Sequence, residues 1–287
     1  MATSPQTSLV DRRVLITGAA RGIGAALSRR LHERGARVAL AGLEPAPLAQ
    51  TAAASGIAPW READVSDGEA ISRAVDELVG ELGGLDIVIA NAGIAKQLPI
   101  VGGQDGVMEQ TMNVNFLGCY YTLRAAGPHI SHPDGYAIAV SSLAAAVNLP
   151  LLGAYSASKA AVETLGNTLR AELKPSGAKV GVAYFAELDT DMTSRGFSTE
   201  AARSLTGGKT VSRVSSLESG INALERGIRK RSRRIYAPGW IRPLVPLRDV
   251  AQRVIDLRSY RDLPGALQTA RREQAEFTTV QPQRVCE

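Results

Sequence analysis

Tyr155 and Lys159 stand four positions apart in AYSASK (154–159), a segment that otherwise contains only small residues. On a helix, this spacing places the phenol and the ammonium on the same face. A neighbouring ammonium favours phenolate and lowers the pKa of a tyrosine from its reference value of about 10, so that the side chain can exchange a proton with a substrate oxygen. The alternative interpretation is a surface contact worth about a few tenths of a kcal/mol.

A second chemical motif is the glycine-rich loop TGAARGIG (17–24), which begins where the apolar run VLIT ends. Such a loop before a helix permits a tight turn, a close approach of the backbone to a phosphate, and free N–H groups at a positive helix end. We therefore expect a dinucleotide here rather than an ordinary turn. The residues expected to bind it are Gly18, Arg21, Gly22, Ile23 and Gly24.

The choice between NAD and NADP depends on the end of the second apolar run, RVALAG (37–42). An acidic side chain at this place binds the ribose hydroxyls of NAD, whereas a basic one meets the additional phosphate of NADP. Gly42 and Leu43 are neither, Glu44 could act as the acid, and Arg21 could contact the phosphate. Because Gly42 removes the usual carboxylate, we expect a slight preference for NADP.

Short apolar runs alternate with longer helical patterns along most of the chain. The runs are RVLITG (13–18), RVALAG (37–42), DIVIAN (86–91), AIAVSS (137–142), KVGVAY (179–184) and RRIYAP (233–238), and a helix is predicted at about 22–34. This alternation predicts an α/β fold with a doubly wound parallel sheet, the Rossmann type, covered by helices on both faces. We expect a tail at 1–8 and one dinucleotide-binding catalytic domain at 9–240.

The C-terminal region, 241–287, is predicted to be a helical extension. Leu247, Val250, Val254 and Leu257 recur at helical spacing. We expect a helix that packs on the body of the protein or on a neighbouring subunit, with disorder near the end of the chain.

Composition and charge argue against several classes of protein. The 287 residues are 45% apolar and 21% charged, without an apolar run long enough to span a bilayer, which indicates a cytoplasmic globular protein. The net charge of +5 is concentrated in RKRSRR (229–234), which we interpret as a solvated face and not as a nucleic-acid site, because no aromatic platform accompanies it. Cys119 and Cys286 lack metal or disulfide spacing, and we expect Cys119 to be buried and no metal to be bound.

The motifs together resemble those of the short-chain dehydrogenase/reductase family. TGAARGIG, ADV (63–65), NAG (91–93), Asn115 within NVNFLG, SS (141–142) and YSASK (155–159) occur in the family's order and at its spacings. The resemblance covers about residues 9–240. It implies an oxidoreductase that transfers a hydride between NAD or NADP and a small-molecule alcohol or ketone, and that assembles as a homotetramer or dimer.

The resemblance also implies roles for individual residues. Tyr155 would be the acid/base, Ser142 would hold the substrate oxygen, Lys159 would bind the nicotinamide ribose, and the carbonyl of Asn115 would hold a water. Ser142 is favoured over Ser141 because it lies thirteen positions before Tyr155, the family's usual interval. Further cofactor contacts would come from Asp64, Val65, Asn91, Ala92, Gly93, Leu188 and Thr190.

The sequence indicates the substrate-binding residues less clearly than the cofactor-binding ones. Phe185 and Ala186 stand where the family commonly has PG, so we expect a different pocket shape. Residues 192–211 are expected to form a lid with glycine hinges, and Glu187 to face solvent. The glycines are Gly196, Gly207 and Gly208, and the expected pocket residues are Ile94, Leu143 and Asn148.

These features predict a mainly apolar secondary alcohol or ketone as the substrate, because no cluster of arginines demands an acidic one. A same-family enzyme of another reaction, such as imine reduction, dehydration or isomerisation, would share the same residues. A non-catalytic dinucleotide-sensing regulator is the third reading, and its natural signature, a damaged catalytic set, is not seen.

Overall fold

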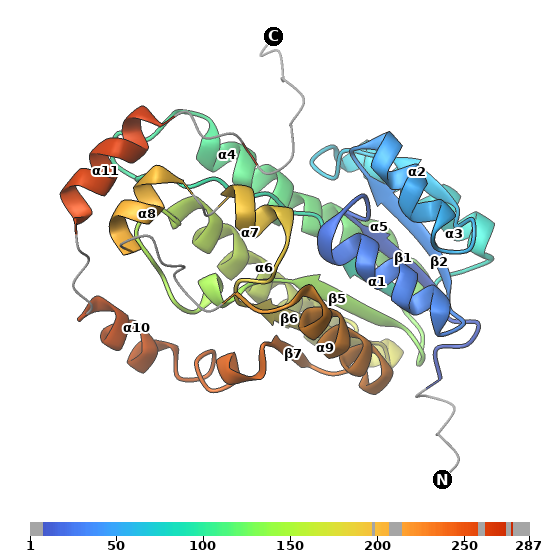
Figure 1. Ribbon diagram of the computed structural model, residues 1–287. Coiled ribbons are helices and arrows are strands. Elements are labelled where there is room, and N and C mark those ends of the chain that lie inside the picture. Colours follow the sequence, from blue (N-terminus) through green and yellow to red (C-terminus); the bar gives the residue numbers. More distant parts are fainter. Residues whose placement is uncertain (1–7, 197–198, 207–213, 258–261, 274–276, 278–287) are drawn as a thin grey trace.

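A parallel sheet of seven strands forms the centre of the protein (Figure 1). The computed structural model describes residues 8–196, 199–206, 214–257, 262–273 and 277. The strand order is β3-β2-β1-β4-β5-β6-β7, and the order changes direction between β1 and β4 as in a doubly wound dinucleotide fold. The strands are β1 (Arg13–Thr17), β2 (Arg37–Gly42), β3 (Trp60–Glu62), β4 (Ile87–Ala90), β5 (Tyr136–Val140), β6 (Lys179–Phe185) and β7 (Arg234–Ala237).

The predicted α/β fold and its six apolar strands are confirmed. The strand that the apolar pattern did not reveal is β3, which has only three residues, WRE, and lies at the edge of the sheet. An edge strand that is half exposed needs no apolar run, so its sequence carries little strand signal.

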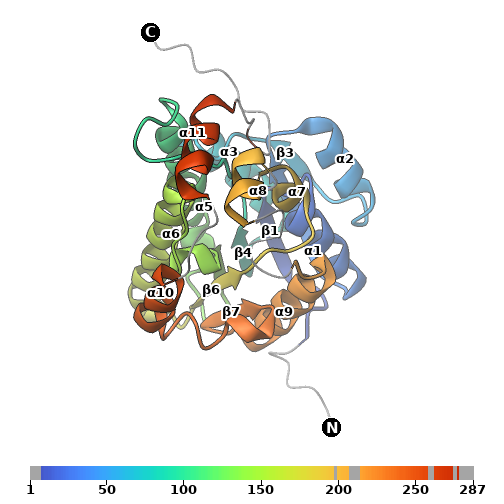
Figure 2. The ribbon, with the colours of Figure 1, turned by 60° about the vertical axis from the view of Figure 1, so that its left-hand side comes forward.

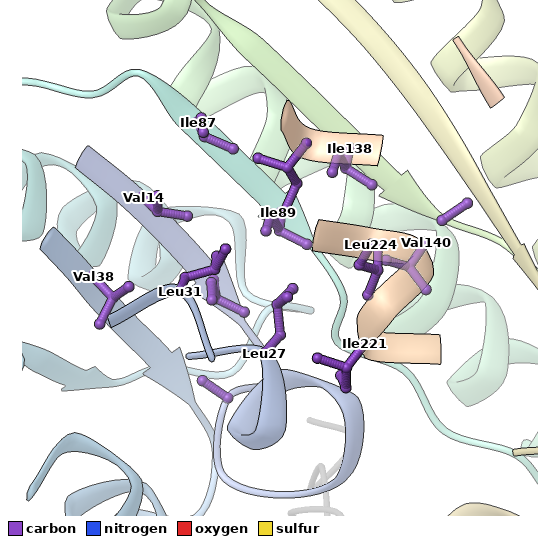
Figure 3. Close-up of a cluster of buried hydrophobic side chains, with 14 of the residues drawn as sticks. Val14, Leu27, Leu31, Val38, Ile87, Ile89, Ile138, Val140, Ile221 and Leu224 are labelled. Atoms are coloured by element: carbon purple, nitrogen blue, oxygen red, sulfur yellow. The ribbon is translucent and has the colours of Figure 1, made fainter. Parts of the chain in front are cut away.

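Helices cover both faces of the sheet because strand residues alternate between the faces. Val14 and Ile16 of β1 point to a core shared with α1 (Gly22–Glu33), α2 (Pro45–Ala53) and α9 (Leu217–Lys230), as Figure 3 shows for part of it. Leu15 points to the opposite core with α3 (Gly68–Leu82), α5 (Gly118–Ile130) and α6 (Gly153–Glu172). Cys119 is buried in this second core, as expected.

The helices behind the second core carry three of the predicted catalytic residues. α4 (Val107–Met112) continues into a π-helical turn, η2 (Asn113–Leu117), and then into α5, so Asn115 lies where the helix is locally wider. α6 begins at Gly153, one residue after Leu152, and its first two turns contain Tyr155 and Lys159.

The chain after β6 closes the substrate side. α7 (Asp191–Gly196) and α8 (Glu200–Thr206) occupy the predicted lid, whereas Phe197, Gly207 and Gly208 lie outside the described residues. Beyond the 3-10 turn η5 (Gly239–Ile241), the extension forms α10 (Arg248–Asp256) and α11 (Leu263–Arg272). Both views place α11 beside α8, and α10 apart from them next to the β7 side (Figures 1 and 2).

The predicted apolar face of the extension helix does not pack on the body of the protein, and its packing on a neighbouring subunit stays a prediction. Leu247, Val250, Val254 and Leu257 are all exposed, with exposed fractions of 57–85%. α10 packs on the body through its opposite side, where Ala251 and Ile255 meet a cluster that includes Tyr184. Polar contacts also fix α10 to the body. Arg248 Nη2 donates to Glu163 Oε1 at 2.6 Å, and the Gln252 side chain bonds the backbone of Asn148.

Candidate active site

Most of the predicted site residues line one cavity of about 260 Å³ at the carboxyl ends of the strands. The exceptions are Gly24 and Asn115, which lie beneath its wall. The predicted residues that line the cavity are Gly18, Arg21, Gly22, Ile23, Gly42, Leu43, Asp64, Val65, Asn91, Ala92, Gly93, Ser142, Tyr155, Lys159, Leu188 and Thr190. Residues from seven separate segments of the chain therefore meet at one site.

The glycine loop between β1 and α1 is tightly enclosed by backbone. Gly18 has a φ of +65°, and a Cβ there would lie 2.7 Å from Ala92 Cα. A Cβ on Gly24 would lie 2.3 Å from the Gly18 carbonyl oxygen. Asn91 holds the loop in place, since its Nδ2 donates to the carbonyl oxygens of Thr17 at 3.0 Å and Gly18 at 3.2 Å.

This loop fits a dinucleotide phosphate. Arg21, the residue before α1, makes no side-chain hydrogen bond to the first turn of the helix, and that turn contains no acidic residue. The N–H groups and the positive end of the helix dipole are therefore available to an anion at the cavity wall.

Opposite charges lie at the end of β2, where the adenosine ribose is expected. The Arg21 guanidinium pairs with the Glu44 carboxylate, and its Nη1 lies 3.6 Å from Asp191 Oδ2. On the far wall, Asp64 Oδ1 accepts hydrogen bonds from the backbone N–H and the hydroxyl of Ser66. Asp64 therefore stabilises the turn before α3, and the same residue lines the cavity.

Tyr155 and Lys159 share one face of α6, as their spacing predicts. Lys159 Nζ lies 5.7 Å from the centre of the Tyr155 ring and donates a hydrogen bond of 3.0 Å to the Val140 carbonyl oxygen. Burial lowers the pKa of Lys159 to about 8. Burial raises the pKa of Tyr155, and a hydrogen bond with Ser142 offsets part of that rise.

The predicted lowering of the Tyr155 pKa is therefore not produced by the residues of this chain. The physical reason is that both side chains are withdrawn from water, which disfavours the phenolate and the ammonium alike. In the protein by itself, Tyr155 is a neutral phenol at physiological pH, suited to donate a proton.

The two serines after β5 have different partners. Ser141 Oγ donates to the Lys159 carbonyl oxygen at 2.8 Å and so fastens α6 to the sheet. Ser142 Oγ accepts the Ala144 backbone N–H at 3.1 Å, donates toward the Phe185 carbonyl oxygen at 3.2 Å, and interacts with Tyr155. Ser142 is thus the serine whose hydroxyl meets the phenol.

Asn115 is buried and acts on its neighbours through its side chain. Its Oδ1 accepts the Ile94 N–H at 2.8 Å, and its Nδ2 donates to the Ile94 carbonyl oxygen and to Ser158 Oγ. A Cβ on Gly93 would lie 3.2 Å from Asn115 Oδ1 and 3.3 Å from Lys159 Nζ. The NAG loop, η2 and α6 are thereby held together around Lys159.

The substrate side of the cavity is mostly apolar. Ile94 and Leu143 line it as expected, but Asn148 does not, because it is exposed and its backbone bonds Gln252 of α10. Glu187, which we expected to face solvent, lines the cavity and is half-buried. The remaining wall is formed by Val147, Leu149, Leu152, Phe185, Met192 and Gln97.

Three polar residues of the substrate side were missed by the sequence interpretation. Gln97 lines the cavity and bonds Thr199, which directly precedes α8, and Glu273 accepts the N–H groups of Glu200 and Ala201. A threonine before EAA is a helix-start signal that could have been recognised. Gln97 and Glu273 carry no such local signal. Gln97 bonds a residue 102 positions away in the sequence, and Glu273 bonds one 73 positions away.

The geometry agrees with the comparisons to known proteins. The short chain dehydrogenase family model matches residues 12–201. The chain belongs to the short-chain dehydrogenase/reductase family, and it is an oxidoreductase of that family, whose members use NAD or NADP on CH–OH groups. In the described segments, no helix has the length and apolar character needed to cross a membrane.

Several individual relatives are similar over most of the chain. The 11-beta-hydroxysteroid dehydrogenase-like 2 of Arabidopsis thaliana is 30% identical over 87% of this chain and 80% of its own length. A probable galactose dehydrogenase, GalD, of Rhizobium meliloti is 31% identical over 70% of this chain and 80% of its own length.

Solved structures share the fold. A dehydrogenase/reductase from Sinorhizobium meliloti superimposes with a TM-score of 0.69 and 30% identity, covering 80% of this chain and 96% of its own. A short-chain dehydrogenase/reductase from Burkholderia phymatum, solved in complex with NAD, has a TM-score of 0.76 and 20% identity over 86% of this chain and 96% of its own.

Proposed function

We propose that this protein interconverts a mainly apolar secondary alcohol and the corresponding ketone, with NAD or NADP as the hydride carrier. The observation that carries the proposal is that Ser142, Tyr155 and Lys159 line the same cavity as the glycine loop, with an apolar wall beside them. A hydroxyl, a phenol and an ammonium around one oxygen site are the groups that a carbonyl reduction requires.

The chain's own residues account for the proton in this reaction. In the reducing direction, the neutral Tyr155 phenol donates its proton to the substrate oxygen while Ser142 holds that oxygen and stabilises its developing charge. Lys159 would bind the nicotinamide ribose, and Asn115 would hold, through its carbonyl, a water that returns the proton. The dinucleotide supplies or accepts the hydride, and Leu188 and Thr190 would hold its carboxamide.

The assignment is tested by turnover. Purified protein with NADPH or NADH and a set of hydrophobic ketones should lose absorbance at 340 nm, and Tyr155→Phe should reduce kcat by about 100-fold or more. The variant should bind the nucleotide normally. Unchanged turnover in Tyr155→Phe would remove Tyr155 from the reaction, and turnover of an imine but of no ketone would favour the other reaction of the family.

For the cofactor, we propose a slight preference for NADP. Gly42 carries no carboxylate at the end of β2, and the Arg21 guanidinium lies beside it at the cavity wall. NAD is the second candidate, because Glu44 lines the same place and could receive the ribose hydroxyls. Comparing the dissociation constants of the two nucleotides decides this, and Glu44→Gln should shift the ratio toward NADP by about threefold to tenfold, since it removes a repulsive charge.

We also propose that the protein is a homo-oligomer, a dimer or tetramer, located in the cytoplasm. The exposed strip of Leu247, Val250, Val254 and Leu257 on α10 supports an oligomer, since four apolar side chains share one solvent-facing side of a helix. Light scattering of the wild type and of Val250→Lys would test this, and a monomeric wild type would contradict it.

A further inference from the structure

Gln97 is the uncharged amide in the substrate-side wall. It is 7% exposed and its residue lines the cavity, among side chains that are otherwise mainly apolar. Its position relative to the catalytic helix is constrained, because the next residue, Leu98, donates its N–H to the Leu151 carbonyl oxygen at 2.9 Å just before α6. A buried amide has two N–H donors and a carbonyl acceptor, and each needs a partner.

The carbonyl end of this amide lies against Thr199. Thr199 Oγ1 accepts the backbone N–H of Ala202 at 3.1 Å, as the cap of α8. Its hydroxyl proton is donated to Gln97 Oε1. The carbonyl end of Gln97 is therefore used by the lid, and the NH₂ end is turned away from it.

Among the described residues, the only side-chain hydrogen bond of Gln97 is the one that its carbonyl oxygen accepts, and its NH₂ group is not among the polar atoms sealed from solvent, so it is open to the cavity that Gln97 lines. A hydrocarbon packed against it would leave both donors unsatisfied, which is costly in a buried site. A ligand oxygen at this point would satisfy them.

We propose that Gln97 Nε2 donates a hydrogen bond to a second oxygen of the substrate, remote from the carbon that reacts at Tyr155. The substrate class is then an apolar ketone or secondary alcohol that carries a further ether, carbonyl or hydroxyl oxygen as an acceptor. This inference rests on the proposed function and makes Gln97 a specificity-determining residue of the same site.

The test compares ketones of equal length that differ by one atom. The probes are octan-2-one and its analogues 4-propoxybutan-2-one, 5-ethoxypentan-2-one and 6-methoxyhexan-2-one, in which an ether oxygen replaces one methylene at increasing distance from the carbonyl. The ether oxygen accepts a hydrogen bond and cannot be reduced. We expect kcat/KM of the wild type for one analogue to exceed that for octan-2-one by about tenfold, the scale of one hydrogen bond.

Three variants separate recognition from structure, and the readout is the ratio of kcat/KM between the analogue and octan-2-one. Gln97→Leu should bring this ratio close to one. Gln97→Glu keeps an acceptor for Thr199 but removes the NH₂ donors, so it should lose the preference as well. Thr199→Val breaks the bond to the lid and leaves the donors of Gln97, so the preference should remain.

A general structural defect in a variant would lower kcat/KM for the ether analogue and for octan-2-one alike, and it would leave the ratio of the two unchanged. A wild-type ratio of one for all three ethers, or a preference retained in both Gln97 variants, would overturn the inference while the proposed function stands. If the wild type reduced none of the four ketones, the proposed function would fail, and the inference with it.

Discussion

The cavity wall differs in composition between the end where the dinucleotide is expected, the cofactor end, and the opposite, substrate end. At the cofactor end, the walls are backbone: Gly18 and Gly24 leave no room for a Cβ, and Asn91 bonds the carbonyl oxygens of that loop. At the substrate end, the walls are side chains and short helices, and side chains such as Thr199 and Glu273 hold them. A backbone wall restricts the residue type severely, whereas a side-chain wall can be formed by many combinations.

The largest difference between the ends should appear when a methyl group is added to the cofactor loop. Gly24→Ala places a Cβ 2.3 Å from one backbone oxygen and 2.9 Å from Ala19 Cα, so the backbone itself must shift. We expect a loss of unfolding free energy of about 3 kcal/mol and a dinucleotide dissociation constant raised about 100-fold. Urea denaturation and fluorescence titration measure the two quantities.

The matched control for this variant is Gly80→Ala in α3, where a Cβ would meet nothing within 4 Å. That exchange should stabilise the protein by about 0.5–1 kcal/mol, because alanine favours a helix over glycine. An equal change of unfolding free energy in Gly24→Ala and Gly80→Ala would show that the glycine loop has room for a Cβ, which would contradict the prediction.

Lys159 lies where the two ends meet, and its burial should cost stability in the protein without cofactor. Its pKa is lowered from 10.5 to about 8 by burial. Below pH 8 both the folded and the unfolded states hold the proton, and the cost of the buried ammonium is complete. Between pH 8 and 10.5 only the unfolded state holds it, so the stability of the wild type rises with pH and the cost disappears above 10.5.

Lys159→Met should therefore be more stable than the wild type by about 2 kcal/mol at pH 7. This value is the burial cost that is removed minus the hydrogen bond to the Val140 carbonyl oxygen that is lost. The difference should shrink as the pH rises from 8 to 10.5, as urea denaturation would show. Lys179→Met, at an exposed position, is the control and should show no such trend. A constant difference would contradict the assigned burial cost.

The smallest expected effect concerns the substrate end alone. Glu273, directly after α11, accepts the N–H groups of Glu200 at 2.9 Å and Ala201 at 3.2 Å and so holds the first turn of α8. Glu273→Ala should loosen this helix by about 1 kcal/mol and raise the substrate KM about fivefold. The nucleotide dissociation constant should stay within about twofold, because the cofactor loop is untouched.

Glu172→Ala, at an exposed position at the end of α6, serves as its control and should change neither constant. A parallel rise of both constants in Glu273→Ala would mean that α8 and the cofactor loop respond together, and that the two ends of the cavity are not independent.

The motifs at the cofactor end are local, and the binding roles that they predict stay predictions. TGAARGIG, NAG and YSASK each combine the residue type with the position in a strand-to-helix connection, and the predicted residues meet at one cavity. Asn148 was wrongly placed, because loop position alone does not say which side a neighbouring element will cover. The strip at Leu247 does not pack on the body, and its packing on a neighbouring subunit stays a prediction. Thr199 carries only a helix-start signal, and Gln97 and Glu273 carry no motif, so their contacts with α8 became visible only in the fold.

Periodicity and glycine positions were sufficient to predict the α/β fold, and the resemblance of the motifs to those of the short-chain dehydrogenase/reductase family predicted the class of chemistry. These features act over one turn or one strand, where sequence distance and spatial distance agree. Tertiary structure alone decided that burial raises the pKa of Tyr155 and that α11 supports the lid. It also decided that Gln97 lines the cavity, since burial and hydrogen-bond partners depend on segments that the chain brings together only when it folds.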